Sequence, residues 1–126
     1  MQICKNGKLV KEQLREVGYK QTAEEFYELM KEFLPGKYLT YFKEKVKRIR
    51  DSLIKTRALF PNLRLYGASI LVTLDGDAKD IDDDSLRVKL IDLAHCYFDI
   101  SKLGIDIYNS TYDDHVIAGL QNLINM

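Results

Sequence analysis

The sequence predicts an α+β fold, in which short antiparallel strands are packed with amphipathic helices. Three observations favour this class. Apolar residues alternate with period 2 in two runs within residues 63–93, which is typical of strands. Apolar residues recur at helical spacing within residues 22–60 and again within residues 113–125. With 126 residues the chain has the size of one domain and can bury roughly two-thirds of its unfolded surface, so we expect residues 1–126 to form a single domain.

Composition limits the classes of function. The formal net charge is +0, so no overall field favours a nucleic acid or a membrane as the partner. No apolar run approaches the length of a membrane span, and the N-terminal residues lack the apolar core of a signal peptide. The two cysteines and two histidines show neither CxxC nor metal-site spacing. We therefore expect reduced thiols and a cytoplasmic or nuclear location, or both.

Residues 1–11 predict a β-hairpin, in which Asn6-Gly7 forms a two-residue turn between two short strands. A hairpin alone is marginally stable in water, so these strands need neighbours in a larger sheet. We expect the strand edge near Met1 to be exposed and to favour self-association.

Two helices are predicted within residues 22–60. The first begins at Thr22, because Thr22 and Glu25 have the spacing of a capping box, and it ends before Pro35-Gly36. The second runs from about Leu39 to Phe60. One face of this second helix is apolar and consists of Phe42, Val46, Ile49, Leu53 and Phe60.

The remainder of the second helix is strongly basic. Its charged residues are Lys43, Lys45, Lys47, Arg48, Arg50, Lys55 and Arg57, against Glu44 and Asp51. One interpretation is an ordinary solvated helix face. The functional interpretation is a phosphate-binding surface, because several cations on one helix create a local positive potential. A nucleic-acid surface is a third interpretation, which we disfavour because the aromatic residues occupy core positions of the helix.

The first long strand follows Pro61-Asn62. Alternation predicts one face made of Leu65, Gly67, Ser69 and Leu71. The small residues Gly67 and Ala68 suit the close approach of a ligand or of another backbone. The acidic loop of residues 75–84 does not fit an EF-hand, because Lys79 takes the fifth position and no glycine takes the sixth. We expect this loop to be solvated.

Asp92 is the candidate functional residue of the second strand. Alternation predicts that Leu86, Val88, Leu90 and Asp92 share one face. An unpaired negative charge among apolar side chains is costly, so a cation or a set of hydrogen-bond donors is expected beside it. A magnesium ion that carries nucleotide phosphates would meet this need. The alternative is a structural aspartate that caps a turn or pairs with a lysine.

The C-terminal residues predict an irregular segment followed by a helix. Residues 94–110 show no clear periodicity, and His95 within them is either a proton shuttle or a structural residue. Asp113-Asp114 begin the last helix, where carboxylates are favoured by the positive helix end. Its apolar side consists of Val116, Ile117, Leu120, Leu123 and Ile124.

Three strings of residues together resemble the inositol polyphosphate kinase family. Residues 66–76, which contain Ala-Ser-Ile-Leu and end in Asp-Gly, resemble the family's Ser-Ser-Leu-Leu strand with its trailing Asp-Gly. Residues 91–95, Ile-Asp-Leu-Ala-His, resemble its Ile-Asp-Phe-Ala-His. Residues 119–124, Gly-Leu-Gln-Asn-Leu-Ile, resemble its Gly-Leu-x-Asn-Leu-Ile helix. The order and spacing of the strings extend the resemblance over nearly the whole chain.

The resemblance implies the C-terminal lobe of a protein-kinase-like fold, in an enzyme that transfers the γ-phosphate of ATP to an inositol phosphate with Mg²⁺ as the cofactor. It implies that Asp92 binds the metal of the nucleotide and that Ser69 assists the metal or the triphosphate. It also implies that the basic helix belongs to the region that contacts inositol polyphosphates. The resemblance matches no individual lysine or arginine there, and we take Lys43, Lys47 and Arg50 of the basic helix as candidate substrate-binding residues.

The chain also departs from the family pattern, and these departures bear on whether it can catalyse the reaction. The motif PxxxDxKxG, which supplies a catalytic Asp and a phosphate-binding Lys in the family, does not occur in these 126 residues. We therefore expect no catalytic residue within this chain, a C-terminal portion of a kinase, and no phosphoryl transfer by this portion alone. Gln2, at a position where other branches of the family tend to carry a basic residue, favours the hexakisphosphate kinase branch of a hexakisphosphate kinase or multikinase-like protein. The competing hypotheses are a non-catalytic module or degenerate pseudokinase that binds polyanions, and an interaction domain in which Asp92 is structural.

Overall fold

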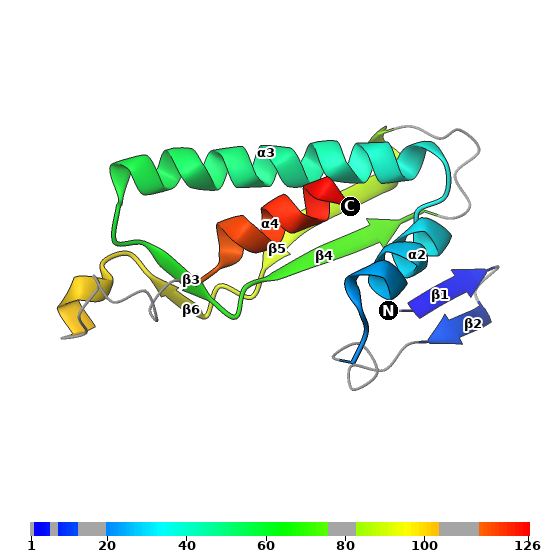
Figure 1. Cartoon of the computed structure of the whole chain (residues 1–126), viewed down its shortest axis with the longest axis horizontal. Helices are drawn as coiled ribbons and strands as arrows, with labels where there is room; N and C mark the ends of the chain where they lie inside the picture. The colour runs from blue at the N-terminus through cyan, green and yellow to red at the C-terminus, as the bar shows by residue number, and fades with distance from the viewer. Residues whose placement is uncertain (1, 6–7, 13–19, 76–82, 104–113) are drawn as a thin grey trace. The chain divides into compact units, whose positions relative to one another are not determined.

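The predicted α+β class is confirmed by a computed structural model of the chain (Figure 1). The structure describes residues 2–5, 8–12, 20–75, 83–103 and 114–126. These residues contain the strands β1 (Gln2–Lys5), β2 (Lys8–Glu12), β3 (Arg64–Tyr66), β4 (Ser69–Leu74), β5 (Leu86–Ile91) and β6 (His95–Tyr97). They also contain the α-helices α2 (Ala23–Phe33), α3 (Lys37–Leu59) and α4 (Val116–Asn125), and the short 3₁₀ helices η1 (Asp83–Ser85) and η2 (Ile100–Leu103). That the chain is a kinase-like lobe stays a prediction.

The strands of the described residues form three separate two-stranded sheets, β1–β2, β3–β6 and β4–β5. The chain divides into two compact units, residues 1–42 with 73–87 and residues 43–72 with 88–126. The expectation of a single domain therefore stays a prediction. No described helix is long and apolar enough to cross a membrane.

The first unit contains the predicted hairpin and the predicted first helix. Strands β1 and β2 pair antiparallel, from Gln2 with Glu12 to Lys5 with Lys8; the proposed turn residues 6–7 lie outside the described part. The capping box is confirmed, since the backbone N–H of Glu25 donates to Thr22 Oγ1 at 3.2 Å and that of Thr22 donates to Glu25 Oε2 at 2.8 Å. The buried side chains of this unit are Met30, Leu34, Tyr38, Phe42 and Leu86.

The second unit contains most of α3 together with α4. Its buried side chains are Val46, Leu53, Leu63, Leu65, Ile100 and Leu120. Helix α3 matches the predicted second helix to within two residues, and its predicted apolar face is largely confirmed. Phe60 is the exception, because α3 ends at Leu59 and Phe60 is 46% exposed. Its ring contacts that of Phe98 edge to face, with 5.8 Å between the centroids.

The predicted long strand after Pro61-Asn62 is wrong, because the chain turns at Gly67. Gly67 has a φ of +69°, in the left-handed region that glycine adopts without the steric cost of a Cβ. The turn separates β3, which pairs with β6, from β4, which pairs with β5. As a result the predicted common face does not exist: Leu65 is buried, whereas Ser69 and Leu71 are exposed.

The expectation of an irregular segment over residues 94–110 was also wrong in part. Residues 95–97 form β6, which pairs antiparallel with β3, and residues 100–103 form η2. His95 therefore lies in a strand opposite Tyr66. Helix α4 confirms the predicted last helix, although it begins at Val116, two residues after Asp114; Asp113 lies outside the described residues.

Candidate functional site

Ser69 and Asp92 both belong to the second unit and lie between two strand pairs, β3–β6 and β4–β5. The β3–β6 pair ends with Tyr66 opposite His95. Ser69 follows Tyr66 by three residues, and Asp92 precedes His95 by three residues. Beyond the break β4 begins at Ser69, and its partner β5 ends at Ile91, just before Asp92. The fold thus brings the two segments whose residues the family resemblance selects to the place where the β3–β6 pair ends and the β4–β5 pair begins, which is called the break in the sheet below (Figure 1).

Asp92 does not lie on the apolar face of β5, and that expectation is wrong. Alternation holds within the strand, where Leu86 is buried, Val88 and Leu90 are half-buried, and Ile91 is exposed. It stops at Ile91, because Asp92 has a φ of +62°, which no strand residue adopts. Asp92 is exposed. The argument that a buried charge requires a cation is therefore lost.

The left-handed backbone of Asp92 supplies a different physical argument for the site. This conformation costs roughly 1–2 kcal/mol for an ordinary L-residue, somewhat less for Asp and Asn, and almost nothing for glycine. A carboxylate therefore occupies a position where glycine would be favoured on conformational grounds. Residues held in such conformations cluster at functional sites, so the backbone of Asp92 supports a functional role for its side chain.

The oxygen ligands that Asp92 and Ser69 offer suit a magnesium ion whose remaining ligands are water and phosphate oxygens. Asp92 contributes an exposed carboxylate and Ser69 an exposed hydroxyl. Within the described residues, no group of three or more His, Cys, Asp or Glu side chains could hold a metal by itself. Mg²⁺ at phosphate-transfer sites is bound through one or two carboxylates and completes its shell with water and phosphate oxygens. The residues present fit a magnesium–nucleotide complex better than a closed protein cage.

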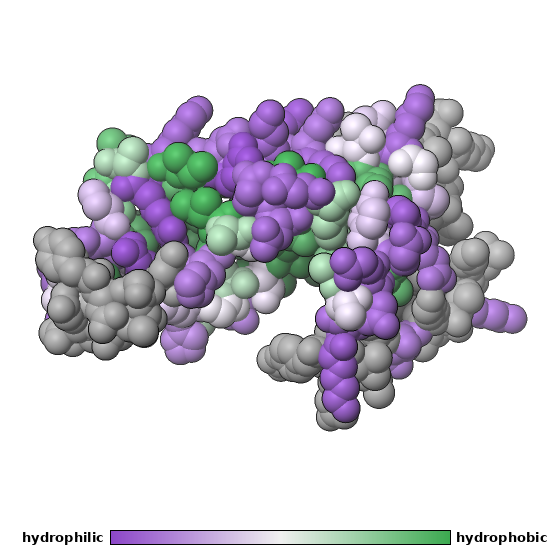
Figure 2. Space-filling model, in the orientation of Figure 1, coloured by the Kyte–Doolittle hydropathy of each residue, from purple (hydrophilic) through white to green (hydrophobic). Residues whose placement is uncertain are grey.

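The three basic candidates on α3 share one stripe of the helix, at positions i, i+4 and i+7. Lys47 is exposed and Lys43 is half-buried. Arg50 differs, because its guanidinium has partners within the protein: Nε and Nη2 donate to Asp51 Oδ1 at 2.9 and 2.6 Å, and Nη1 donates to Gln121 Oε1 at 2.5 Å. To bind a substrate phosphate, Arg50 would have to exchange these partners. In the view of Figure 2 hydrophilic side chains line much of α3, whereas hydrophobic side chains show near its C-terminal end, where Ile54 and Leu59 are exposed.

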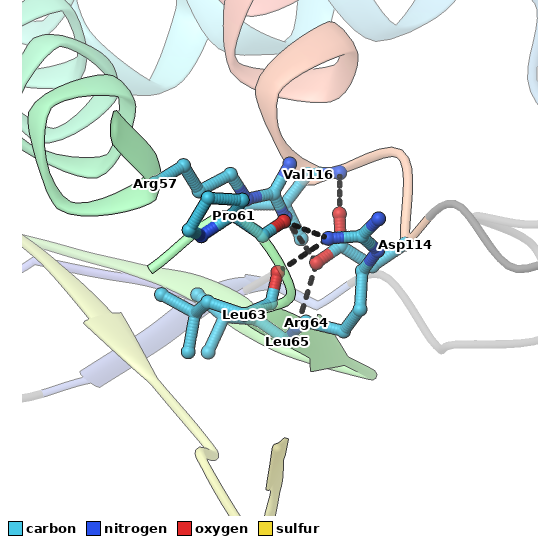
Figure 3. A network of polar contacts seen from close by, with 7 residues as sticks. All are labelled: Arg57, Pro61, Leu63, Arg64, Leu65, Asp114 and Val116. Carbon is cyan, nitrogen blue, oxygen red and sulfur yellow. Dashed lines mark hydrogen bonds and ion pairs between the residues drawn. The ribbon is translucent and has the colours of Figure 1, made fainter. Parts of the chain in front are cut away.

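Asp114 is the residue that sequence reasoning undervalued. Its side chain is 0% exposed, and it accepts hydrogen bonds from three segments of the second unit (Figure 3). Oδ2 accepts from Nη2 of Arg57 on α3 and, at 2.6 Å, from the backbone N–H of Leu65 on β3. Oδ1 accepts from the backbone N–H of Val116 at 3.2 Å, at the start of α4. The sequence signal was only an acidic pair before a helix, which predicts a dipole interaction and no partners.

The charge state of Asp114 follows from this environment. Burial by itself would raise the pKa of the Asp114 carboxyl. The hydrogen bond from Arg57, those from the Leu65 and Val116 amides, and the charge of Arg57 outweigh the burial, so the pKa lies below its ordinary value. The carboxylate is therefore ionised at neutral pH and forms a buried ion pair.

A second arginine lies beside this ion pair. Nη1 of Arg64 donates to the carbonyl oxygens of Pro61 at 3.0 Å and Leu63 at 2.8 Å, which holds the turn before β3 (Figure 3). The Nε atoms of Arg57 and Arg64 are buried without a hydrogen-bond partner. The Asp114 carboxylate and the two arginines thus connect the end of α3, the turn, β3 and the start of α4.

Comparison with known proteins places the chain in a family. The family model described as "Inositol polyphosphate kinase" matches residues 1–126, which is every residue of the chain. No curated protein and no solved structure gives a significant match.

Proposed function

This chain belongs to the inositol polyphosphate kinase family, and from that premise we propose that it carries the metal and phosphate site of an ATP-dependent inositol phosphate kinase. Asp92 would hold the magnesium ion of the nucleotide, and Ser69 would assist the metal or the triphosphate. The observation that supports this proposal most is the exposed, left-handed Asp92 at the break in the sheet where β4 begins at Ser69.

The chemistry of phosphoryl transfer fits these side chains. A bound magnesium ion neutralises the charge of the transferred phosphate. The carboxylate of Asp92 is exposed and can reach a ligand, and the hydroxyl of Ser69 can donate to a phosphate oxygen or coordinate the metal through its lone pairs. On α3, Lys43 and Lys47 would attract the inositol phosphate, whose charge is strongly negative.

Phosphoryl transfer needs several groups to act together, including a catalytic base and a lysine on the phosphates. The PxxxDxKxG motif that supplies them in the family does not occur in these 126 residues. We therefore propose that these residues alone, as the C-terminal portion of a kinase, transfer phosphate at no measurable rate. We also propose a cytoplasmic or nuclear location, or both, and a tendency to self-associate through the edge of the β1–β2 sheet.

The second candidate function is a non-catalytic module that binds polyanions. It is favoured by the exposed cations Lys47, Arg48 and Lys55 on α3. Such a module would bind inositol phosphates through charge alone and would not need Asp92.

Titration calorimetry of the 126-residue chain with magnesium–ATP, and separately with an inositol polyphosphate, distinguishes the two functions. Asp92→Asn keeps the shape and the left-handed tolerance of the residue but removes the charge that the metal needs. It should abolish nucleotide binding and leave polyanion binding nearly unchanged. Lys47→Glu should weaken polyanion binding and leave nucleotide binding nearly unchanged.

Asp84→Asn is the matched control, because Asp84 is also an exposed carboxylate but lies in η1. This control should change neither titration. If magnesium–ATP binds Asp92→Asn as tightly as the wild type, the metal assignment is wrong, and the polyanion module becomes the better description.

A further inference from the structure

Both oxygens of the buried Asp114 carboxylate are occupied by donors from within the chain. Oδ2 accepts hydrogen bonds from Arg57 and Leu65, and Oδ1 accepts one from Val116. Because the side chain is 0% exposed, it has no surface with which to contact a substrate or a metal. Any influence of Asp114 on the proposed site must therefore pass through the segments that it holds.

The contact with Leu65 leads most directly to the proposed site. Leu65 is the middle residue of β3 and pairs with Cys96 of β6. Ser69 lies four residues after Leu65 along the chain, and Asp92 lies four residues before Cys96. The hydrogen bond from Leu65 to Asp114 thus fixes the centre of the strand pair from which both site residues extend.

The β3–β6 pair needs such a constraint because it is short. Each strand has three residues, so few backbone hydrogen bonds hold the register. A slip of one residue would turn every side chain of a strand to the opposite face and would move the break at which β4 begins. The buried Leu65 side chain also opposes a slip, since it would become exposed.

From these contacts we infer that Asp114 is a positioning residue, which holds β3 in the register that brings Ser69 and Asp92 together. The inference rests on the proposed function and deepens it, since it adds a buried residue that the nucleotide never touches. Arg57 acts with Asp114, because it supplies the positive charge that keeps the carboxylate ionised at the end of α3.

The test measures metal binding at the site separately from folding. Mn²⁺ replaces Mg²⁺ in the presence of ATP, and paramagnetic broadening of the Ser69 and Asp92 amide signals reports binding at that place. Asp114→Asn presents an NH₂ group to three donors, so at least one of them loses its acceptor. We expect the variant to weaken Mn²⁺–ATP binding about 10–100-fold, as loss of an outer partner does at metal sites, at temperatures where circular dichroism shows a folded chain.

Gln121→Met is the matched control. It removes the hydrogen bond from Arg50 Nη1 on α3 to Gln121 Oε1 on α4. Gln121 has no hydrogen bond to β3 among the described contacts. If a general loosening of the helices were enough to weaken the site, both variants would weaken Mn²⁺–ATP binding. The inference requires Asp114→Asn alone to do so.

A measurement on the wild type covers the case in which Asp114→Asn does not fold. If the β3 register and nucleotide binding are coupled, the coupling is reciprocal, so magnesium–ATP must slow hydrogen exchange of the Leu65 amide. The amide of Leu34, which donates to the Met30 carbonyl at the end of α2, serves as the reference. An unchanged rate at Leu65, while Asp92-dependent binding occurs, would overturn the positioning role.

The outcomes separate this inference from the proposed function. If Mn²⁺–ATP causes no broadening that depends on Asp92, the proposed function fails and the inference fails with it. If such broadening occurs and persists with equal affinity in a folded Asp114→Asn variant, only the positioning role fails.

Discussion

The backbone of Asp92 predicts that the protein tolerates glycine at this position better than alanine. With a φ of +62°, alanine at this position would bear the left-handed penalty of roughly 1–2 kcal/mol, which glycine avoids. Glycine increases the entropy of the unfolded chain, which offsets about 0.4–1 kcal/mol of that advantage. Asp92→Gly should therefore be more stable than Asp92→Ala by about 1 kcal/mol, the reverse of the usual order.

Urea unfolding followed by circular dichroism measures this difference. For a chain of this size, about 1 kcal/mol corresponds to a shift of roughly 3–5 °C in the thermal midpoint, so thermal unfolding gives an independent check. The same pair of substitutions at Asp84 is the control. Asp84 lies in η1 and does not have a positive φ, so alanine should be at least as stable as glycine there.

Both Asp92 variants should lose magnesium–ATP binding, because both lack the carboxylate. Asp92→Gly would then be the more stable of the two variants and would still not bind magnesium–ATP. Equal stability of the two Asp92 variants, or greater stability of the alanine variant, would refute the left-handed backbone and the reasoning built on it.

The remaining predictions concern two glycines and the buried ion pair. Gly67→Ala should lower the free energy of unfolding, measured with urea, by about 1 kcal/mol, because Gly67 has a φ of +69°. The backbone conformation is the whole cause, since a Cβ there would meet no other atom within 4 Å. Gly119→Ala should instead stabilise by roughly 0.5–1 kcal/mol, because Gly119 is exposed within α4 and an added Cβ again meets nothing. A destabilised Gly119→Ala would mean that another surface packs closely against α4. Because the pKa of Asp114 is lower in the folded state, its ionisation contributes to stability. This contribution is complete at pH values above the ordinary carboxyl pKa of 3.8 and is lost as the pH falls through the folded-state pKa. The urea midpoint should therefore fall in acid, and Asp114→Asn should reduce that fall; an equally steep fall in the variant would contradict the assignment.

Local signals in the sequence predicted the helices well. The capping box of Thr22 and Glu25 involves residues three apart, and Pro35-Gly36 ends the helix through its own backbone preferences. Helix α3 was predicted because its apolar face repeats over several turns. These features depend on neighbours along the chain, which is why the pattern was sufficient.

The break in the sheet could not be read from the alternation. The period-2 pattern runs through Gly67 without interruption, and glycine is compatible with both a strand and a left-handed turn. The same pattern extended the second strand one residue too far, to Asp92. The backbone torsion that ends a strand leaves no trace in the order of apolar and polar residues.

The buried carboxylate was missed because two of its three hydrogen-bond partners are remote in sequence. Asp114 lies 57 residues from Arg57 and 49 residues from Leu65. No periodicity connects positions so far apart, and one of the partners is a backbone amide that every residue but proline carries. Asp92 was selected by the alternation, on an apolar-face argument that proved wrong, and also by the family resemblance, whereas Ser69 came from the resemblance alone.

Paramagnetic mapping of the wild-type chain with Mn²⁺ and ATP tests the magnesium site most directly, because it locates the metal among all the amide signals without any substitution. The signals around Ser69 and Asp92 should broaden first, and magnesium should reverse the broadening by competition. Broadening that begins instead at the acidic end of β4 near Asp75, or that spreads evenly over the exposed carboxylates, would contradict a metal site at the break in the sheet.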